Sequence, residues 1–272
     1  MRRNQKESKM SQQKKQKQVE NTKISHGKGK IIEGDPKDFE RNPMRHHWDA
    51  VFAGHPALNR APYHRGVITQ QFRKLKTKIL PHNVNQLDKT SYVFLVTSSL
   101  PQEGVTCTAL NLATSLSLEK DWQTVIIDGC GHKNSLSSQL RGGALLGLMD
   151  YLDDAAQLEQ IIYPLPSPNL YIMPHGTLNP CRSECFASQK MESLMMATRK
   201  TFSKSFIIID APATYEFSEA QILSQYCDGI IFVCHKTQTP YDTFMNSIQS
   251  LPQEKISGVV LNHASFYSQT AE

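Results

Sequence analysis

The chain has 272 residues, of which 39% are hydrophobic and 8% aromatic, so it can bury a core but lacks the apolar excess of a membrane protein. Its charge is uneven, because residues 1–30 hold 10 basic and 2 acidic side chains, whereas residues 31–272 hold 20 and 23. No apolar stretch follows the basic start, as a secretory signal would require, and no later run approaches the roughly 20 residues of a membrane span. The sequence therefore predicts one or two soluble domains in the cytoplasm.

Six cysteines are scattered along the chain, several of them beside apolar runs: Cys107, Cys130, Cys181, Cys185, Cys227 and Cys234. They form no Cys-x2-Cys pair, and no histidine stands at the spacing typical of a zinc site. Cys181 and Cys185 lie four residues apart, but two ligands on one helix face are too few for a metal. We therefore expect reduced thiols that are mostly buried.

The beginning of the chain differs in composition from the remainder. Residues 1–30 are mainly Lys, Gln, Ser and Asn, which predicts a disordered basic tail. Composition favours a solvated arm, and weak contact with an anionic membrane is the alternative, since each Lys near such a surface adds about 1 kcal/mol. No specific nucleic-acid site is indicated. Residues 31–63 contain four prolines and are predicted to be a linker, followed by one domain over residues 64–268.

From Gly66 onward, helix-length amphipathic stretches alternate with short β-rich runs. The first helix places Ile68, Phe72, Leu75 and Ile79 on one face. The predicted strands cover residues 92–97, 124–128, 170–173, 206–210, 229–234 and 258–262, and the later helices cover residues 105–119, 184–202, 218–226 and 240–250. This alternation indicates an α/β fold with a doubly wound, mostly parallel sheet, and the loop described next makes that sheet similar to those of P-loop NTPases. Ligands on such sheets bind at the carboxyl ends of the strands.

A loop that resembles a phosphate-binding loop follows the first predicted strand. Such a loop needs glycine for close backbone approach, N–H groups at a helix N-terminus, a lysine on the phosphates and a hydroxyl for Mg²⁺. Gly104 and Thr106 meet two of these needs. However, Val105 stands where the lysine belongs, and Ser99 stands where the first glycine usually lies. The motif is therefore half present.

The second and fourth predicted strands each end in an aspartate, Asp128 and Asp210. Together with Thr106 they offer the hard oxygen ligands that a nucleotide-bound Mg²⁺ prefers. One aspartate alone at a strand end more often caps the following turn. Three such elements in the correct order favour the metal site instead.

Further segments extend this pattern across most of the domain. The matching segments are residues 99–106 and 111–113 for the phosphate loop and its helix, 127–134 for a Walker A′ segment, 183–191 for a helix, 210–213 for a Walker B segment and 258–262 for a strand. In order and spacing, residues 66–265 resemble the bacterial tyrosine kinases (BY-kinases). They especially resemble the autokinases of exosortase-associated exopolysaccharide loci.

The resemblance implies a Mg-ATP-dependent kinase that phosphorylates its own C-terminal tyrosines, cycles between oligomer and monomer, and controls polysaccharide chain length or export. ATP or ADP would contact Ser99, Glu103, Gly104, Val105, Thr106, Cys107 and Lys133. Mg²⁺ would be held by Thr106, Asp128 and Asp210, and the two aspartates would be catalytic. The implied partner is a membrane polysaccharide co-polymerase, or chain-length determinant protein. The chain would then work at the inner face of the membrane.

Departures from the family pattern fall where the chemistry should be. Val105 removes the phosphate-binding lysine, Cys130 replaces the second Walker A′ aspartate, and Gln102 replaces a loop glycine. Tyr267 is the one tyrosine of the last 30 residues, where the family has a cluster. The family's oligomerisation pattern Glu-x-x-Arg-x-x-Arg appears only as Gln70-x-x-Arg73-x-x-Lys76.

These departures decide between two interpretations of the activity. The lost lysine removes a charge-assisted bond worth about 1.5–3 kcal/mol, or roughly ten- to a hundredfold in affinity, and a lost transition-state donor lowers the rate by about 10²–10³. We therefore interpret the chain as a degenerate kinase that regulates exopolysaccharide or capsule assembly. The alternative is an active tyrosine autokinase that uses Lys133 or a lysine of a neighbouring subunit. A partitioning-type ATPase is disfavoured, because residues 97–103 contain no signature lysine.

Four further residues keep their ordinary interpretations. His175, which follows a predicted strand, could face the site but is expected to be a solvated loop residue. Arg73 and Lys76 fit an exposed basic helix face as well as a subunit interface. Tyr267 is expected to be a tail residue rather than a phosphate acceptor.

Overall fold

The computed structural model describes residues 67–80, 90–132, 135–140, 145–165 and 167–264, and all of them belong to one compact unit of the chain. The predicted basic tail over 1–30 and the linker over 31–63 lie outside the described residues, as do Lys133 and Tyr267. The limits of the predicted domain, 64–268, therefore stay a prediction.

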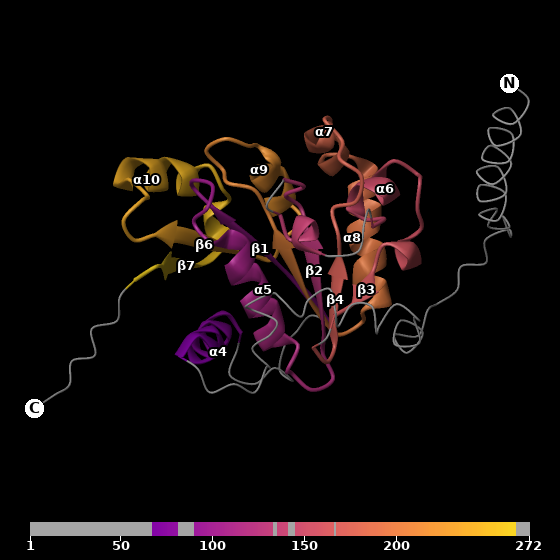
Figure 1. Cartoon of the computed structure of the whole chain (residues 1–272), viewed down its shortest axis with the longest axis horizontal. Coiled ribbons are helices and arrows are strands. Elements are labelled where there is room, and N and C mark those ends of the chain that lie inside the picture. The colour runs from indigo at the N-terminus through magenta and orange to yellow at the C-terminus, as the bar shows by residue number, and fades with distance from the viewer. Residues whose placement is uncertain (1–66, 81–89, 133–134, 141–144, 166, 265–272) are drawn as a thin grey trace, which may run out of the picture. The chain divides into compact units, whose positions relative to one another are not determined.

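The described residues form an α/β fold around one seven-stranded sheet (Figure 1). Its strands are β1 (Ser91–Ser98), β2 (Gln123–Asp128), β3 (Tyr163–Pro164), β4 (Leu170–Met173), β5 (Ser205–Asp210), β6 (Gly229–His235) and β7 (Ile256–Asn262). Their order in the sheet is β3-β4-β2-β5-β1-β6-β7, and every pair is parallel except β3–β4. The central strands are rich in Val, Ile and Phe and are buried on both faces, as a parallel sheet covered by helices requires.

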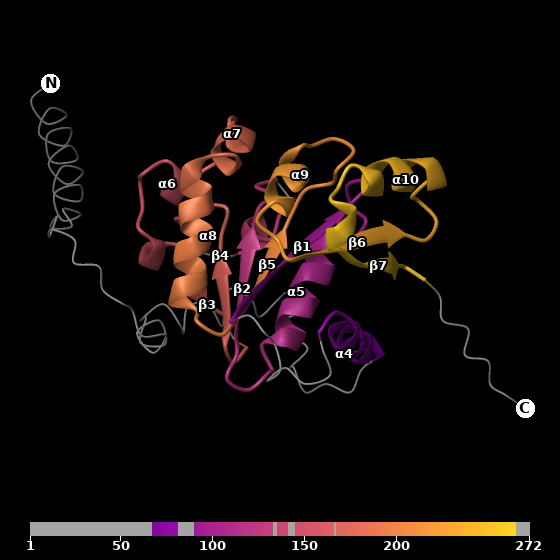
Figure 2. The same ribbon diagram turned by 180° about the vertical axis from the view of Figure 1, so that it is seen from behind.

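Helices cover both faces of this sheet. They are α4 (Val67–Ile79), α5 (Val105–Leu116), α6 (Leu148–Leu152), α7 (Arg182–Phe186), α8 (Gln189–Thr201), α9 (Glu219–Ser224) and α10 (Tyr241–Gln249), with short 3-10 turns at Ser137–Gln139, Leu158–Gln160 and Gln253–Lys255. Buried side chains of α5 and the apolar face of α4 form one core layer, while the other helices build the second. In both views α4 lies beside α5, and α10 and α8 lie at opposite ends of the sheet (Figures 1 and 2).

The predicted doubly wound sheet is confirmed, although the short helix α6 was not predicted and two further elements depart from the expected pattern. The helix expected over 184–202 is interrupted, because α7 ends at Phe186 and Ser188 caps a new helix by accepting a hydrogen bond from Met191 N at 3.3 Å. The two-residue strand β3 was not predicted, since it is too short to show an alternating pattern.

The cysteines are only partly as expected. All six are free thiols, but only Cys130 and Cys227 are buried, whereas Cys107 and Cys181 are exposed and the other two are half-buried. The expectation that most are buried is therefore wrong, because proximity to an apolar run does not fix which way a side chain faces. Among the described residues, no helix combines the length and apolar character needed to cross a membrane.

Candidate functional site

The carboxyl ends of three adjacent strands bring the predicted site together. The order β2-β5-β1 puts Asp128 directly opposite Asp210 in the ladder, and Val96 of β1 pairs with Asp210 from the other side. The loop that leaves β1 leads over this edge into α5, which begins at Val105. The segments that were expected to act together are thus neighbours, as the strand topology requires.

The loop after β1 has the backbone of a tight phosphate-type turn. Gln102 adopts φ +66° in place of the family's glycine, and Gly104 adopts φ +94°. A Cβ on Gly104 would lie 2.1 Å from Asn262 Nδ2 at the end of β7, and the same Nδ2 donates a hydrogen bond to Glu103 O at 2.8 Å. Glycine is therefore required at position 104 by both conformation and space.

Glu103 and Ser99 support the loop from behind. The Glu103 carboxylate is fully buried and accepts hydrogen bonds from Leu100 N at 2.9 Å, from His235 N at 3.4 Å and from the Thr239 hydroxyl. Ser99 is buried as well, and its carbonyl accepts Tyr215 N at 3.1 Å. Neither residue is among those that line the neighbouring cavity, and their direct contact with a cofactor stays a prediction.

A cavity of about 580 Å³ lies in front of this loop. It is lined by the start of α5, by Cys130 and His132 after β2, and by residues 211–213, 216 and 217 after β5. Of the predicted cofactor-binding residues, Gly104, Val105, Thr106 and Cys107 face it. Val105 presents an apolar side chain where a phosphate-binding lysine would project. The cavity is large enough for a small ligand, but among the described residues that line it none supplies that lysine cation.

Asp128 is held by four hydrogen bonds that all come from the segment that follows it. Its Oδ1 accepts Cys130 N at 2.9 Å and Gly131 N at 3.3 Å, and its Oδ2 accepts the backbone N–H and the hydroxyl of Ser137 at 2.7 and 2.5 Å. A carboxylate has about four lone-pair sites, and these bonds occupy all of them. Asp128 therefore organises the loop over 129–137, and could bind a metal only by giving up one of these bonds.

Asp210 contrasts with Asp128. It is fully buried, yet neither carboxylate oxygen has a hydrogen-bond partner among the described residues. Burial, reinforced by the charge of Asp128, raises the pKa of Asp210 well above its ordinary value, and the nearby Thr106 side chain opposes this only in part. Such an unpartnered buried carboxyl group needs an explanation.

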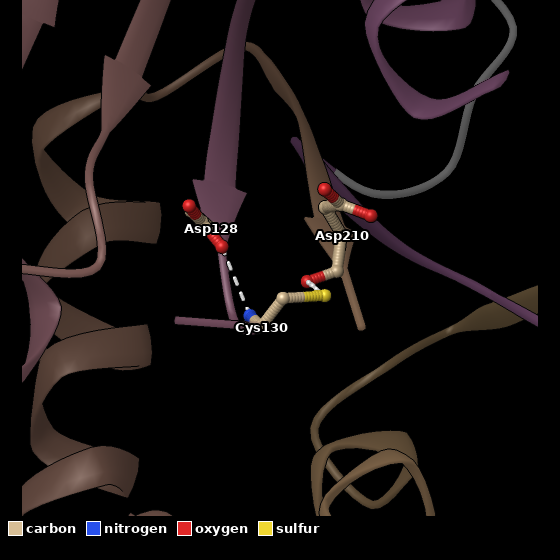
Figure 3. Close-up of side chains that lie close together, drawn as sticks. All are labelled: Asp128, Cys130 and Asp210. Carbon is tan, nitrogen blue, oxygen red and sulfur yellow. Dashed lines mark hydrogen bonds between the residues drawn. The ribbon is translucent and has the colours of Figure 1, made fainter. Parts of the chain in front are cut away.

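Cys130 lies between the two aspartates (Figure 3). Its Sγ is 3.6 Å from Asp210 O, and one ligand atom each from Asp128, Cys130 and Asp210 lie within 4.8 Å of one another. Burial, followed by the charges of Asp210 and Asp128, raises the pKa of the Cys130 thiol well above its usual value. The thiol is therefore protonated at neutral pH unless a cation neutralises the site.

His175 is a correction to the sequence analysis. It was expected to be solvated, but it is only 1% exposed, and its Nδ1 lies 3.4 Å from Asp128 O. Its backbone N–H donates to the Ser137 hydroxyl at 2.7 Å, so it belongs to the same network as Asp128. Burial lowers the pKa of the imidazole. Local sequence gives no signal of this, because β4 sets the position of His175 across the sheet.

Arg182 was not singled out from the sequence. Its Nε donates to Glu219 Oε1 at 2.6 Å, its Nη1 donates to Cys130 O at 3.2 Å, and its guanidinium lies 5.4 Å from the centre of the Phe217 ring. Although burial raises the pKa of Glu219, its bond to Arg182 holds that pKa below the usual value. Arg182 thus ties α7 to the rim of the cavity through partners that are distant in the sequence.

The helix α4 bears on the question of a subunit interface. Lys76 forms an ion pair with Glu119 at 2.5 Å and donates to Ser115 O at 3.4 Å, so its charge is used within the domain, against α5. A structural role therefore explains Lys76 without a second subunit.

The donor set matches Mg²⁺ only in part. Mg²⁺ prefers near-octahedral oxygen ligands. Thr106 and Asp210 offer oxygen, but all four acceptor sites of Asp128 are occupied, and Cys130 places sulfur where the family has a carboxylate. The set therefore does not fit an all-oxygen Mg²⁺ site.

Comparison with known proteins finds relatives of similar sequence and fold. No protein-family model matches the chain. The tyrosine-protein kinase CpsD of Streptococcus agalactiae serotype Ia is 26% identical over 186 residues, which are 67% of this chain and 79% of CpsD. The kinase domain of VpsO, solved by crystallography, superposes with a TM-score of 0.60 at 26% identity, over 74% of this chain and 100% of that domain. In sequence and in fold, the chain resembles the bacterial tyrosine kinases.

Other matches agree with this assignment. The succinoglycan biosynthesis transport protein ExoP of Rhizobium meliloti is 28% identical over 177 residues, which are 63% of this chain but only 22% of ExoP. Solved P-loop ATPases share the fold at lower identity. The chain is thus similar to BY-kinases and shares the fold of P-loop ATPases, and its candidate site departs from the BY-kinase pattern at Val105 and Cys130.

Proposed function

We propose that this chain is a catalytically impaired member of the BY-kinase family that regulates exopolysaccharide or capsule assembly. In this role it would control chain length or export as the partner of a membrane polysaccharide co-polymerase. The named relatives support the pathway, since ExoP is a succinoglycan biosynthesis transport protein and CpsD is a tyrosine-protein kinase. The proposal that the kinase is impaired rather than active rests on the geometry of the candidate site.

The observation that carries the proposal is the apolar wall at Val105. This residue lines the cavity at the first turn of α5, where the resemblance places the lysine that contacts the phosphates. Loss of that charge-assisted bond weakens phosphate binding by about 1.5–3 kcal/mol. The negative charge of the transferred phosphoryl group in the transition state loses the same partner. This loss lowers the rate of phosphoryl transfer by about 10²–10³.

The second support is the state of Asp128. Its carboxylate already holds the loop over 129–137 through four hydrogen bonds, so it is not poised to accept a proton from an acceptor hydroxyl. A catalytic base must have a free lone pair within hydrogen-bond reach of the proton that it removes. Weak nucleotide binding without efficient transfer is the expected outcome.

The first test is calorimetric titration of the full chain with Mg-ATP and Mg-ADP, followed by detection of phosphotyrosine in the same sample. We expect weak binding and no phosphotyrosine. The variant Val105→Lys should bind Mg-ATP roughly ten- to a hundredfold more tightly, because it restores the missing charge-assisted bond. The matched control is Cys107→Lys, which adds the same charge to the same cavity wall two residues later.

Two outcomes would contradict the proposal. Tight Mg-ATP binding by the unmodified chain, with ATP-dependent phosphotyrosine, would identify an active autokinase that obtains its cation elsewhere. Equal gains in affinity from Val105→Lys and Cys107→Lys would show that position 105 is not a specific phosphate contact, and would remove the main support for impairment.

A further inference from the structure

The replacement of a family aspartate by Cys130 creates a donor set that the family does not have. Asp128 ends β2, Cys130 follows it by two residues, and Asp210 ends the adjacent strand β5. One ligand atom from each lies within 4.8 Å of the other two, and all three residues are buried (Figure 3). Two carboxylates and a thiol at this separation form a mixed oxygen and sulfur set.

Asp210 gives independent evidence that something charged belongs here. It has no exposed surface, and its carboxylate oxygens have no hydrogen-bond partner of ordinary geometry among the described residues, although the Thr106 side chain lies close enough to interact with them. A buried carboxylate is normally paired, hydrogen-bonded or bound to a metal, since burial without a partner is costly. Of the described residues near it, the cation Arg182 does not pair with Asp210, because it is engaged by Glu219 and by the carbonyl of Cys130.

The chemistry of the donors selects the kind of cation. Thiolate ligands favour zinc-class cations, whereas Mg²⁺ and Ca²⁺ prefer oxygen alone. A zinc site that is open to ligands takes three protein donors and leaves one position for water or a ligand. Cys130 lines the cavity of about 580 Å³, so an open position would face that cavity.

We propose that Cys130, Asp210 and Asp128 bind a thiophilic divalent cation of the zinc class, with an open coordination position toward the cavity. On binding, the Cys130 thiol releases its proton to solvent through the cavity and coordinates as the thiolate. Asp128 joins by giving up its bond to the Ser137 hydroxyl, which can rotate away, while the three backbone N–H bonds to Asp128 remain. Asp210 gains the partner that it otherwise lacks.

The test uses the full chain, freed of metal with a chelator and kept reduced, and titrated with CoCl₂, CdCl₂ and ZnCl₂. We expect one equivalent of Co²⁺ to give visible d–d bands with a thiolate charge-transfer band, and one equivalent of Zn²⁺ to remove both. A large excess of MgCl₂ should leave the bands unchanged. A wild-type chain that binds none of the three probes would overturn the proposal.

Variants assign the signal to this site. Cys130→Ser should abolish the charge-transfer band and weaken Zn²⁺ binding by at least about a hundredfold. Even residues that only hydrogen-bond to the ligands of a metal contribute about 10–100-fold to its affinity. Cys227→Ser, which changes the other buried thiol, should leave the band intact, as should Cys181→Ser with Cys185→Ser. A band that survives in Cys130→Ser, or that disappears with Cys181 and Cys185, would contradict the assignment.

A gain-of-function variant keeps the test decisive if Cys130→Ser folds poorly. Cys130→Asp restores the aspartate that the family has at this position. It should reverse the preference of the site for Zn²⁺ over Mg²⁺, so that Mg²⁺ binding strengthens while Zn²⁺ binding weakens. Circular dichroism of each variant checks the fold. An unchanged Zn²⁺ preference in folded Cys130→Asp would exclude a coordinating thiolate. These measurements require neither nucleotide nor a protein partner, so they succeed or fail independently of the proposed function.

Discussion

Asp128 and Asp210 occupy equivalent places at the ends of neighbouring strands, but their surroundings are opposite. Asp128 accepts four hydrogen bonds from the loop that follows it, whereas the oxygens of Asp210 have no such partners. The first aspartate therefore stabilises the fold, and the second is strained by burial unless a cation is bound. Residue type and position in a strand do not distinguish the two roles.

The burial of Asp210 has a consequence for stability. Because its folded-state pKa is raised above the usual value, the unfolded chain ionises this carboxyl group first as pH increases. Stability is thus lost as pH rises from the usual Asp pKa toward the folded-state pKa, and then levels off. In chelator at neutral pH, the Asp210→Asn variant should unfold at a higher temperature than the wild type. Its free energy of unfolding should be larger by about 1–2 kcal/mol. The difference should shrink as pH falls toward 4.

A matched aspartate should behave in the opposite way. Asp150 is also buried, but its carboxylate accepts hydrogen bonds from Gly147 N at 2.7 Å, the Thr177 hydroxyl at 2.6 Å and Thr177 N at 3.2 Å. Asp150→Asn should therefore destabilise the fold by about 1–3 kcal/mol. Thermal unfolding of the two variants side by side is the measurement, and destabilisation by Asp210→Asn in chelator would refute the account of Asp210.

At the scale of elements, the loop after β1 is fixed by strands that are distant in the sequence. Asn262 at the end of β7 donates to Glu103 O, and the Glu103 carboxylate accepts from the end of β6 and from Thr239. The loop is therefore held in shape before any ligand arrives. This preorganisation depends on the left-handed glycine at position 104, which Asn262 covers.

Gly104→Ala tests this arrangement. An alanine at φ +94° is strained by about 1–2 kcal/mol, and its Cβ would also clash with the Asn262 side chain. In the Asn262→Ala background the clash disappears, so the same substitution should destabilise less. Urea unfolding of the two single variants and the double variant measures the coupling, which we expect to be at least about 1 kcal/mol. Additive effects would show that Asn262 does not pack against position 104.

Much of the arrangement of elements followed from the sequence, because buried-type strands and amphipathic helices have distinct periods. The strands that carry Asp128 and Asp210 were predicted, and so was their meeting at one edge of the sheet. What failed was the side-chain environment: the burial of His175, the four donors to Asp128 and the contacts of Arg182. These depend on turns and cross-sheet neighbours that no local pattern encodes.

At the scale of the whole chain, charge divides the molecule into two parts. Residues 1–30 carry a net +8, whereas residues 31–272 carry a net −3. A regulatory protein that works beside a membrane co-polymerase would benefit from such a separation. The basic segment would be attracted to an anionic leaflet, whereas the remaining chain, being slightly acidic, would have no such net attraction.

The alternative of weak membrane contact by this segment predicts that the full chain binds vesicles that contain anionic lipid at low salt. Each Lys or Arg near such a surface contributes about 1 kcal/mol, so ten of them suffice for measurable association. Binding should weaken steeply with added salt, because the screening length falls to about 10 Å at 0.1 M. Neutral vesicles, and a chain whose basic residues in 1–30 are replaced by Gln, are the matched controls for co-sedimentation. If the full chain does not bind anionic vesicles even at low salt, the basic segment has no membrane role and the solvated-arm interpretation holds.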